Sequence, residues 1–143
     1  MTQTDDIETL LNGLFPFAEK MLREHGAFFP FGGHIKAGGE LALDSAQAEE
    51  DHPQPQELID RLRDSFRQRA TNDELRACAI VHDVRVVPPG RSETQDAICA
   101  SIDHVDGYSA HVFVPYSFPA PGELVIEEGY ALDGDATVFP PER

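Results

Sequence analysis

Residues 96–116 read DAICASIDHVDGYSAHVFVPY, and this stretch decides the fold. Two runs rich in β-branched and aromatic residues flank the dipeptide Asp106-Gly107, which is typical of a tight turn between antiparallel strands. We therefore predict a hairpin in which Asp96–Val105 pairs with Tyr108–Tyr116 across a two-residue turn. Once the turn is set, the side chains that share each face of the hairpin are set as well.

Both faces of the predicted hairpin carry apolar side chains. One face presents Tyr108, Val112, Val114 and Tyr116, and the other presents Ile98, Ile102 and Phe113. A sheet that is covered by helices on one side only should alternate between apolar and polar residues. We therefore expect a second cover. We predict a homodimer through a sheet face or edge, and the candidate interaction residues are Tyr108, Val112, Val114 and Tyr116.

The first half of the chain predicts two helices and a short hairpin. Apolar residues recur at helical spacing from Ile7 to Leu22, although Pro16 interrupts the run, and a second helical pattern spans residues 55–70. Between them, residues 27–43 predict a strand, a glycine turn and a short second strand.

The second half of the chain is rich in strand patterns. Residues 76–87 predict a long strand that precedes the hairpin, and residues 124–132 predict a last one. We therefore expect one α+β domain over residues 1–143, with a tail from about residue 133 to 143 loosely attached. It should hold an antiparallel sheet of five to six strands and two main helices, in the order α-β-β-α-β-β-β-(β).

The charge of the chain is strongly acidic and unevenly spread. The formal net charge is −15, which argues against nucleic acid and against anionic membrane surfaces, because both are bound through Lys and Arg. Ten acidic residues and no Lys or Arg lie between Ser92 and Glu142, whereas five Arg residues lie between Arg61 and Arg76. The acid-rich part is either a solvated surface or a face for a basic protein partner.

The location and the cysteines follow from composition. No apolar run approaches the roughly 20 residues that span a membrane, and Met1–Asp6 is acidic and polar, unlike a secretory signal. We therefore expect a cytoplasmic protein. Cys78 and Cys99 lie in strand-like apolar segments, where buried free thiols are expected.

Three histidines form the most suggestive grouping for chemistry. His82, His104 and His111 lie on three neighbouring predicted strands. A metal site needs three or four converging ligands, and the sequence has no His-x-His, His-Glu-x-x-His or Cys-x-x-Cys spacing. We therefore predict no catalytic residue, no metal and no cofactor, and we keep these histidines as the alternative site of a small enzyme or a metal or ligand binder.

Two resemblances to known proteins can be drawn. The run Phe28-Phe29-Pro30-Phe31-Gly32, after the predicted first helix, resembles the Phe-x-Pro-Phe-Gly-type segment of small bacterial proteins that are usually described as uncharacterised. The order of elements is similar to that of roadblock and profilin-type folds, in which a central antiparallel sheet carries helices on a face. Neither resemblance implies an activity, a cofactor or a catalytic residue.

The predicted function is a non-enzymatic interaction or regulatory module of a bacterial cytoplasmic protein, and the module is expected to be homodimeric. One alternative is an immunity-type acidic protein that binds a basic partner. A second alternative is the small enzyme or the metal or ligand binder that would use the strand histidines.

Overall fold

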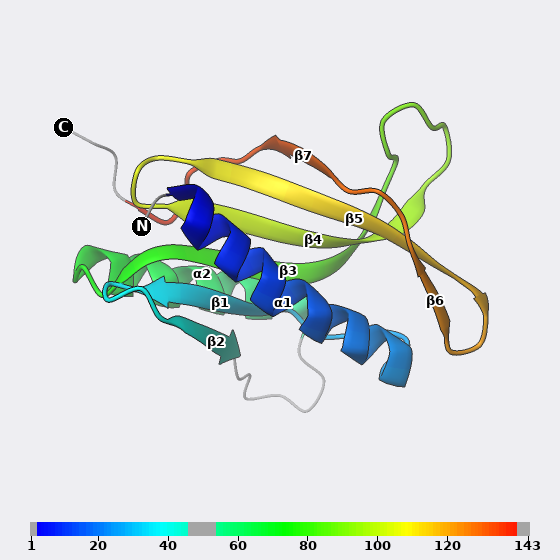
Figure 1. Cartoon of the computed structure of the whole chain (residues 1–143), viewed down its shortest axis with the longest axis horizontal. Coiled ribbons are helices and arrows are strands. Elements are labelled where there is room, and N and C mark those ends of the chain that lie inside the picture. The colour runs from blue at the N-terminus through cyan, green and yellow to red at the C-terminus, as the bar shows by residue number, and fades with distance from the viewer. Residues whose placement is uncertain (1–2, 46–53, 140–143) are drawn as a thin grey trace.

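The computed structural model describes residues 3–45 and 54–139, which form two helices and seven strands of one antiparallel sheet (Figure 1). In chain order, the elements are α1 (Gln3–His25), β1 (Phe31–Lys36), β2 (Leu41–Ser45), α2 (Pro55–Thr71), β3 (Leu75–Val86), β4 (Gln95–His104), β5 (Ser109–Ala120), β6 (Glu123–Ile126) and β7 (Tyr130–Asp133). The predicted α+β class and the predicted order of elements are confirmed.

The strands lie side by side in the order β2-β1-β3-β4-β5-β6, and β7 also pairs with β5. The sheet exceeds the expected five to six strands because the predicted strand 124–132 divides in two. Its first part, β6, pairs with the second half of β5, and its last part, β7, pairs with the first half. Residues 127–129 connect the two parts.

The two helices lie on opposite faces of the sheet, so the fold has three layers (Figure 1). Helix α1 packs on β1, β3 and β4, and helix α2 packs on β3 and β1. Strand β3 is therefore covered on both sides, which explains why it is continuously buried from Ala77 to Val81. Neither described helix combines the length and the apolar content that a membrane span requires.

Each helix closes its own apolar core. The core under α1 consists of Leu10, Leu14, Ala18, Leu22, Phe31, Ile35, Ala77, Ala79, Val81, Ile98, Ala100, Ile102 and Tyr116. The core under α2 consists of Ile59, Leu62, Phe66, Ala70, Leu75, Cys78, Ile80 and Val138. The helical spacing seen in the sequence thus identified the buried stripes of both helices correctly.

Strand β1 has two glycines, Gly32 and Gly33, where both helices approach it. A Cβ atom added to Gly33 would lie 2.7 Å from Cδ2 of Leu14 in α1, on one face of the strand. A Cβ atom added to Gly32 would lie 3.1 Å from the ring of Phe66 in α2, on the other face, and 2.7 Å from the carbonyl oxygen of Ala79. The two glycines therefore serve close packing rather than a turn.

The turn of the β4–β5 hairpin differs from the prediction. Its loop has three residues, because the amide of His104 donates to the carbonyl oxygen of Tyr108 and the amide of Gly107 donates to that of His104. A two-residue type I′ turn would need positive φ at both Asp106 and Gly107, and of these only Gly107 adopts it, at 98°. The result is a type I turn closed by a glycine bulge.

This turn shifts the register by one residue and exchanges the faces of β5. Asp103 lies opposite Ser109, and Ile98 lies opposite Val114, so the predicted pairing was wrong. The shift places Val112 and Val114 on the same face as Ile98, under α1. The middle of the face under α1 thereby becomes apolar, with Ile98, Ala100, Ile102, Val112 and Val114, which the predicted register did not achieve.

Strand β5 includes Pro115 and runs on to Ala120, beyond the predicted end of the strand at Tyr116. The carbonyl oxygen of Pro115 accepts the amide of Glu127, so this edge of residue 115 faces away from β4. Proline has no backbone N–H, and the position where that donor would lie is on the same side of β5. It is opposite residues 127–129, which connect β6 to β7. Pro115 therefore costs β4 no hydrogen bond.

The segment after β7 is anchored, in contrast to the loosely attached tail that we predicted. Residues 134–139, which we call the C-terminal strap, cross from β5 to α2. Val138 is buried in the core under α2, and Arg67 donates its Nε–H to the carbonyl oxygen of Thr137 at 2.7 Å. Residues 140–143 of the predicted tail lie outside the described residues.

The close packing on β1 predicts that Gly32→Ala lowers the free energy of unfolding by about 1–3 kcal/mol, because the new methyl group meets a backbone oxygen and a buried ring. Urea unfolding measures this loss. Gly38→Ala in the exposed turn of the same hairpin is the matched control, since its Cβ would meet only the side chain of Glu40. Equal stability of the two variants would contradict the packing role of Gly32.

Candidate functional site

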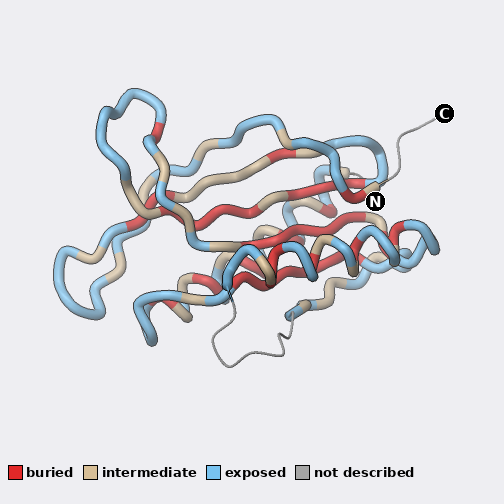
Figure 2. The backbone as a smooth tube through the Cα atoms, turned by 180° about the vertical axis from the view of Figure 1, so that it is seen from behind, coloured by how far each residue is buried: buried red, intermediate tan, exposed pale blue. Residues whose placement is uncertain are grey.

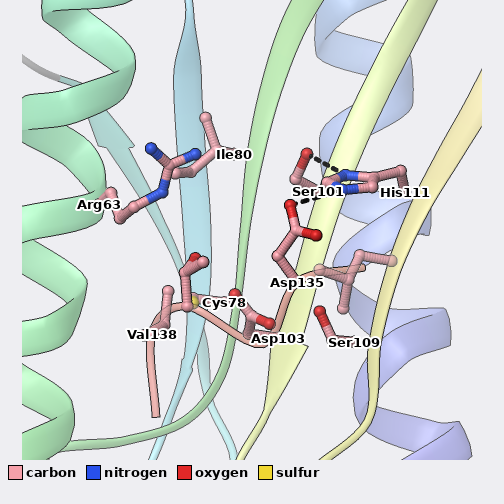
Figure 3. Close-up of a pocket in the computed structure, with 11 residues that line it drawn as sticks. Arg63, Cys78, Ile80, Ser101, Asp103, Ser109, His111, Asp135 and Val138 are labelled. Carbon is pink, nitrogen blue, oxygen red and sulfur yellow. Dashed lines mark hydrogen bonds and ion pairs between the residues drawn. The ribbon is translucent and has the colours of Figure 1, made fainter. Parts of the chain in front are cut away.

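A small polar pocket lies between α2, the sheet and the C-terminal strap (Figure 3). Its volume is about 30 Å³, which is room for one water-sized group. The polar side chains that line it are Arg63, Ser101, Asp103, Ser109, His111, Asp135 and Thr137. They come from α2, β4, β5 and the strap, so the pocket exists only when the distant parts of the chain have assembled.

The hairpin register brings four of these side chains together. Ser101 lies opposite His111, and Asp103 lies opposite Ser109, on the face of the sheet that α2 and the strap share. Because side chains alternate along each strand, all four point to this face. With the predicted two-residue turn, Ser101 and His111 would have pointed to opposite faces.

Ser101, His111 and Asp135 form a chain of polar contacts. The Ser101 hydroxyl lies 2.8 Å from Nδ1 of His111, and Nε2 of His111 lies 3.8 Å from Oδ2 of Asp135 (Figure 3). The carboxylate favours a proton on Nε2, so Nδ1 accepts the hydrogen of the Ser101 hydroxyl. Acyl transfer would also require backbone donors for an oxyanion, but Ser101 lies inside β4, whose backbone pairs with β3 and β5.

Asp103 is the most buried acid of the pocket, and only 9% of its surface is exposed. Burial raises the pKa of its carboxyl, although a hydrogen bond with Ser109 acts in the opposite direction. Its oxygen Oδ1 is buried and has no hydrogen-bond partner among the residues that the structure describes. An unpaired buried carboxylate oxygen is costly, so this atom marks a place where a hydrogen-bond donor would be stabilising.

His82 and Cys99 lie on the same face as Ser101, and they are direct partners in the β3–β4 register. Along each strand they are two residues away from the pair Ile80 and Ser101. Burial lowers the pKa of His82 to about 4, and the charges of His111 and Arg63 act in the same direction. Burial raises the pKa of Cys99 to about 11, and that of Cys78 is raised as well. Both thiols are therefore protonated at neutral pH, which does not suit a nucleophile.

His104, the third candidate histidine, lies on the opposite face and is separated from the other two. Its Nε2 donates to Oδ2 of Asp6 at 2.9 Å, while its Nδ1 accepts the backbone amide of Asp106 at 3.1 Å. Arg76 donates to the other oxygen of Asp6 at 2.6 Å. The cluster ties the first turn of α1 to β3 and to the β4–β5 turn, so His104 has a structural role.

The residues predicted for interaction lie mostly under α1. Tyr116 is part of the core, and Val112 and Val114 pack against it. The Tyr116 hydroxyl donates to Asp83 at 2.7 Å. Tyr108, beside the hairpin turn, is the exposed member of the group. Their role in an interaction stays a prediction, but three of the four face the interior of this chain.

An apolar surface also remains accessible on the other face of the sheet, the one that carries α2. It is formed by five side chains that project from β3, β5 and β7, and we call it the open patch: His82, Val84, Phe113, Tyr130 and Leu132. The rings of Phe113 and Tyr130 stack at a centroid distance of 5.1 Å. Leu132 is exposed, and the other four are partly exposed.

A further polar cluster escaped the sequence analysis. Nδ1 of His34 lies 2.6 Å from Oδ2 of Asp44, and Arg69 donates to the other oxygen of Asp44 at 3.1 Å. The Arg69 guanidinium also lies over the ring of Phe66. The only sequence signal was the run of arginines on α2, and it does not reveal that one of them turns toward β1 and β2.

Among the described residues, no group of three or more His, Cys, Asp or Glu side chains is arranged to hold a metal ion. The three candidate histidines illustrate the reason, because the sheet itself separates His104 from His82 and His111.

Asp6→Asn should lower the free energy of unfolding at pH 7 by roughly 1–3 kcal/mol, because it weakens two charged hydrogen bonds. Burial raises the pKa of Asp6, but the hydrogen bonds from His104 and Arg76 outweigh it, and the pKa lies below its usual value. Its stabilising effect is therefore present above about pH 4 and is lost as the pH falls through the lowered pKa. Urea unfolding across this range measures it, with Glu8→Gln on the exposed side of α1 as the control. Equal losses in both variants would exclude the cluster as a stabilising contact.

The imidazole of His82 should titrate with a pKa of about 4 when it is followed by NMR. Because the unfolded chain takes up this proton near pH 6.5, the protein should lose stability as the pH falls from about 6.5 to about 4. His82→Gln should reduce that slope. A His82 resonance that titrates at its ordinary pKa would show that the ring is hydrated and not packed as described.

Comparison with known proteins finds no matching family model, no similar curated protein and no similar solved structure. The two resemblances drawn from the sequence stay resemblances. The function is therefore argued from the geometry of the pocket and of the open patch.

Proposed function

We propose that this protein is a non-enzymatic interaction or regulatory module that forms a homodimer through the open patch. The proposal rests on one observation. On the side of the sheet where α2 packs, the helix covers some strands and leaves others uncovered. Helix α2 packs on β3 and β1, and β4, β5 and β7 lie beside it (Figure 2). The strap reaches one end of these strands, and the open patch lies beyond it.

The composition of the open patch favours a protein partner. It combines a stacked aromatic pair, Phe113 and Tyr130, with Leu132, of which 55% is exposed. Aromatic and aliphatic side chains that gather on one accessible surface are typical of interaction sites, whereas single exposed apolar residues are ordinary. Packing this face against another sheet would remove the apolar surface from water.

The charge of the open patch favours a second copy of this chain as the partner. The net charge is −15, so two copies repel each other over most of their surfaces. The patch spans three rows of paired residues on the α2 face. They are Val84, Ala97 and Pro115; His82, Cys99, Phe113 and Tyr130; and Ile80, Ser101, His111 and Leu132, and none of these is acidic. Two such faces can approach without burying like charges.

A homodimer with two-fold symmetry would pair the open patch with itself. Each copy would then cover the apolar face that the other leaves accessible, as predicted for a hairpin with two apolar faces. The low pKa of His82 suits this arrangement, because a neutral imidazole can be buried at an interface at a smaller cost than a charged one. We keep the cytoplasm as the expected location.

The two alternatives differ in their support. Exposed acids next to β7, namely Glu128, Asp133 and Asp135, favour an acidic face for a basic partner as the second candidate. Such binding would weaken steeply as salt is added, whereas an apolar homodimer would respond little. An enzyme that uses the three histidines together has less support, since His104 faces away from the other two.

Leu132→Asp should weaken the homodimer by at least about tenfold, because it buries an unpaired charge in the apolar interface. Sedimentation velocity over a range of micromolar concentrations measures the dissociation constant. Leu43→Asp is the matched control: Leu43 is also a strand leucine, and its exposed fraction of 54% nearly equals the 55% of Leu132, but it lies on β2 at the far edge of the sheet.

Two outcomes would contradict the proposal. One is a wild-type protein that sediments as a monomer throughout the micromolar range. The other is an equal effect of Leu132→Asp and Leu43→Asp on the dimer, which would move the interface away from the open patch. Circular dichroism of both variants confirms that the fold is retained.

A further inference from the structure

We propose that the polar pocket under the C-terminal strap binds one primary ammonium group. The pocket lies beside the open patch and shares no residue with it, so the inference does not depend on the homodimer. It rests on the hydrogen-bonding needs of Asp103, on the direction of the hydroxyl groups, and on the balance of charge.

Two hydroxyl groups of the pocket, those of Ser101 and Ser109, already interact with neighbouring side chains. Ser101 donates to Nδ1 of His111, and Ser109 acts to lower the pKa of the neighbouring Asp103 carboxyl. Ser109 also accepts the amide of Ala136 in the strap at 3.0 Å. The Ser101 oxygen therefore has lone pairs left as acceptors, which a hydrogen-bond donor in the pocket would satisfy.

Asp103 supplies the strongest acceptor. Its Oδ1 is buried and unpartnered among the described residues, and it belongs to a side chain that is nine-tenths buried. The carboxylates of Asp103 and Asp135 both line the pocket, and Asp135 stands at its mouth with 82% of its side chain exposed. A donor placed between them would satisfy an oxygen that no described side chain or amide reaches.

The balance of charge favours a cation over a neutral or an anionic group. Two carboxylates face the pocket, and the cation that lines it, Arg63, is shared with Asp60 at 3.6 Å. The buried thiol of Cys78 is protonated and adds no charge. An anion would meet Asp103 directly, whereas an ammonium group gains the attraction of both acids.

The size of the pocket favours an ammonium group with a single substituent. A volume of about 30 Å³ accepts one water-sized head and excludes a methylated, bulkier one. The carbon substituent on the nitrogen would extend out of the pocket past Asp135, where the pocket is open to solvent. The same head group occurs on a free small amine and on a lysine side chain of a protein, and the experiment separates these two sources.

The test is an NMR titration that follows the side-chain carboxyl of Asp103 and the ring of His111. Methylammonium chloride should cause saturable shifts and lower the pKa of Asp103, because a bound cation stabilises its charged form. Tetramethylammonium chloride at the same ionic strength has no N–H donor and should cause none. A lysine-containing peptide that binds more tightly than methylammonium would identify a protein partner as the source, and equal binding would identify a free amine.

Asp103→Asn should weaken methylammonium binding by at least about tenfold, since it removes the buried charge. Asp133→Asn is the matched control, because Asp133 is an exposed acid on neighbouring β7 that does not line the pocket. Ser101→Ala provides a second variant if Asp103→Asn unfolds, and it should weaken binding by removing one acceptor.

Three outcomes would overturn the proposal. Shifts that stay linear in methylammonium, or that tetramethylammonium reproduces, would show a bulk salt effect. Binding that Asp103→Asn leaves unchanged would place the cation elsewhere. A high-resolution crystal structure grown in methylammonium chloride that holds water only at Oδ1 of Asp103 would show that the pocket is a hydration site.

Discussion

The packing of Leu14 and Phe66 against the two faces of β1 is the contact on which the three-layer arrangement depends. Gly33 admits Leu14 from α1, and Gly32 admits Phe66 from α2, so both helices approach the same strand closely. Strand β1 in turn pairs with β3, which contributes buried residues to both cores. Bulky residues at these two positions would push the helices away from the sheet on both sides and open both cores.

Local patterns in the sequence predicted most of the fold. The helical spacing of Leu58, Leu62 and Phe66 predicted the buried stripe of α2, and the glycine-rich segment predicted the β1–β2 hairpin correctly. The turn at Gly107 was harder, because an Asp-Gly pair suits both a two-residue turn and the last part of a three-residue one. Tertiary packing decides between them, since only one register places Val112 and Val114 under α1.

The candidate site was less accessible to sequence analysis because its members come from distant parts of the chain. Ser101 and His111 meet through a register that a one-residue difference in the turn reverses. Arg63 and Asp135 join them only after α2 and the strap have packed together on the same face of the sheet. No spacing in the sequence reveals such a set, and the same limit applies to Asp6, His104 and Arg76.

The tie between Asp6 and His104 also constrains the order of folding, because it joins residues 98 positions apart. Helix α1 is made early in synthesis, but its buried face rests on β3 and β4, which follow much later. Until His104 has left the ribosome, Leu10 and Leu14 lack much of their core, and the nascent helix exposes an apolar stripe. Contacts of such sequence separation slow the closure of the chain, so α1 is expected to complete its packing only after β3 and β4 are in place.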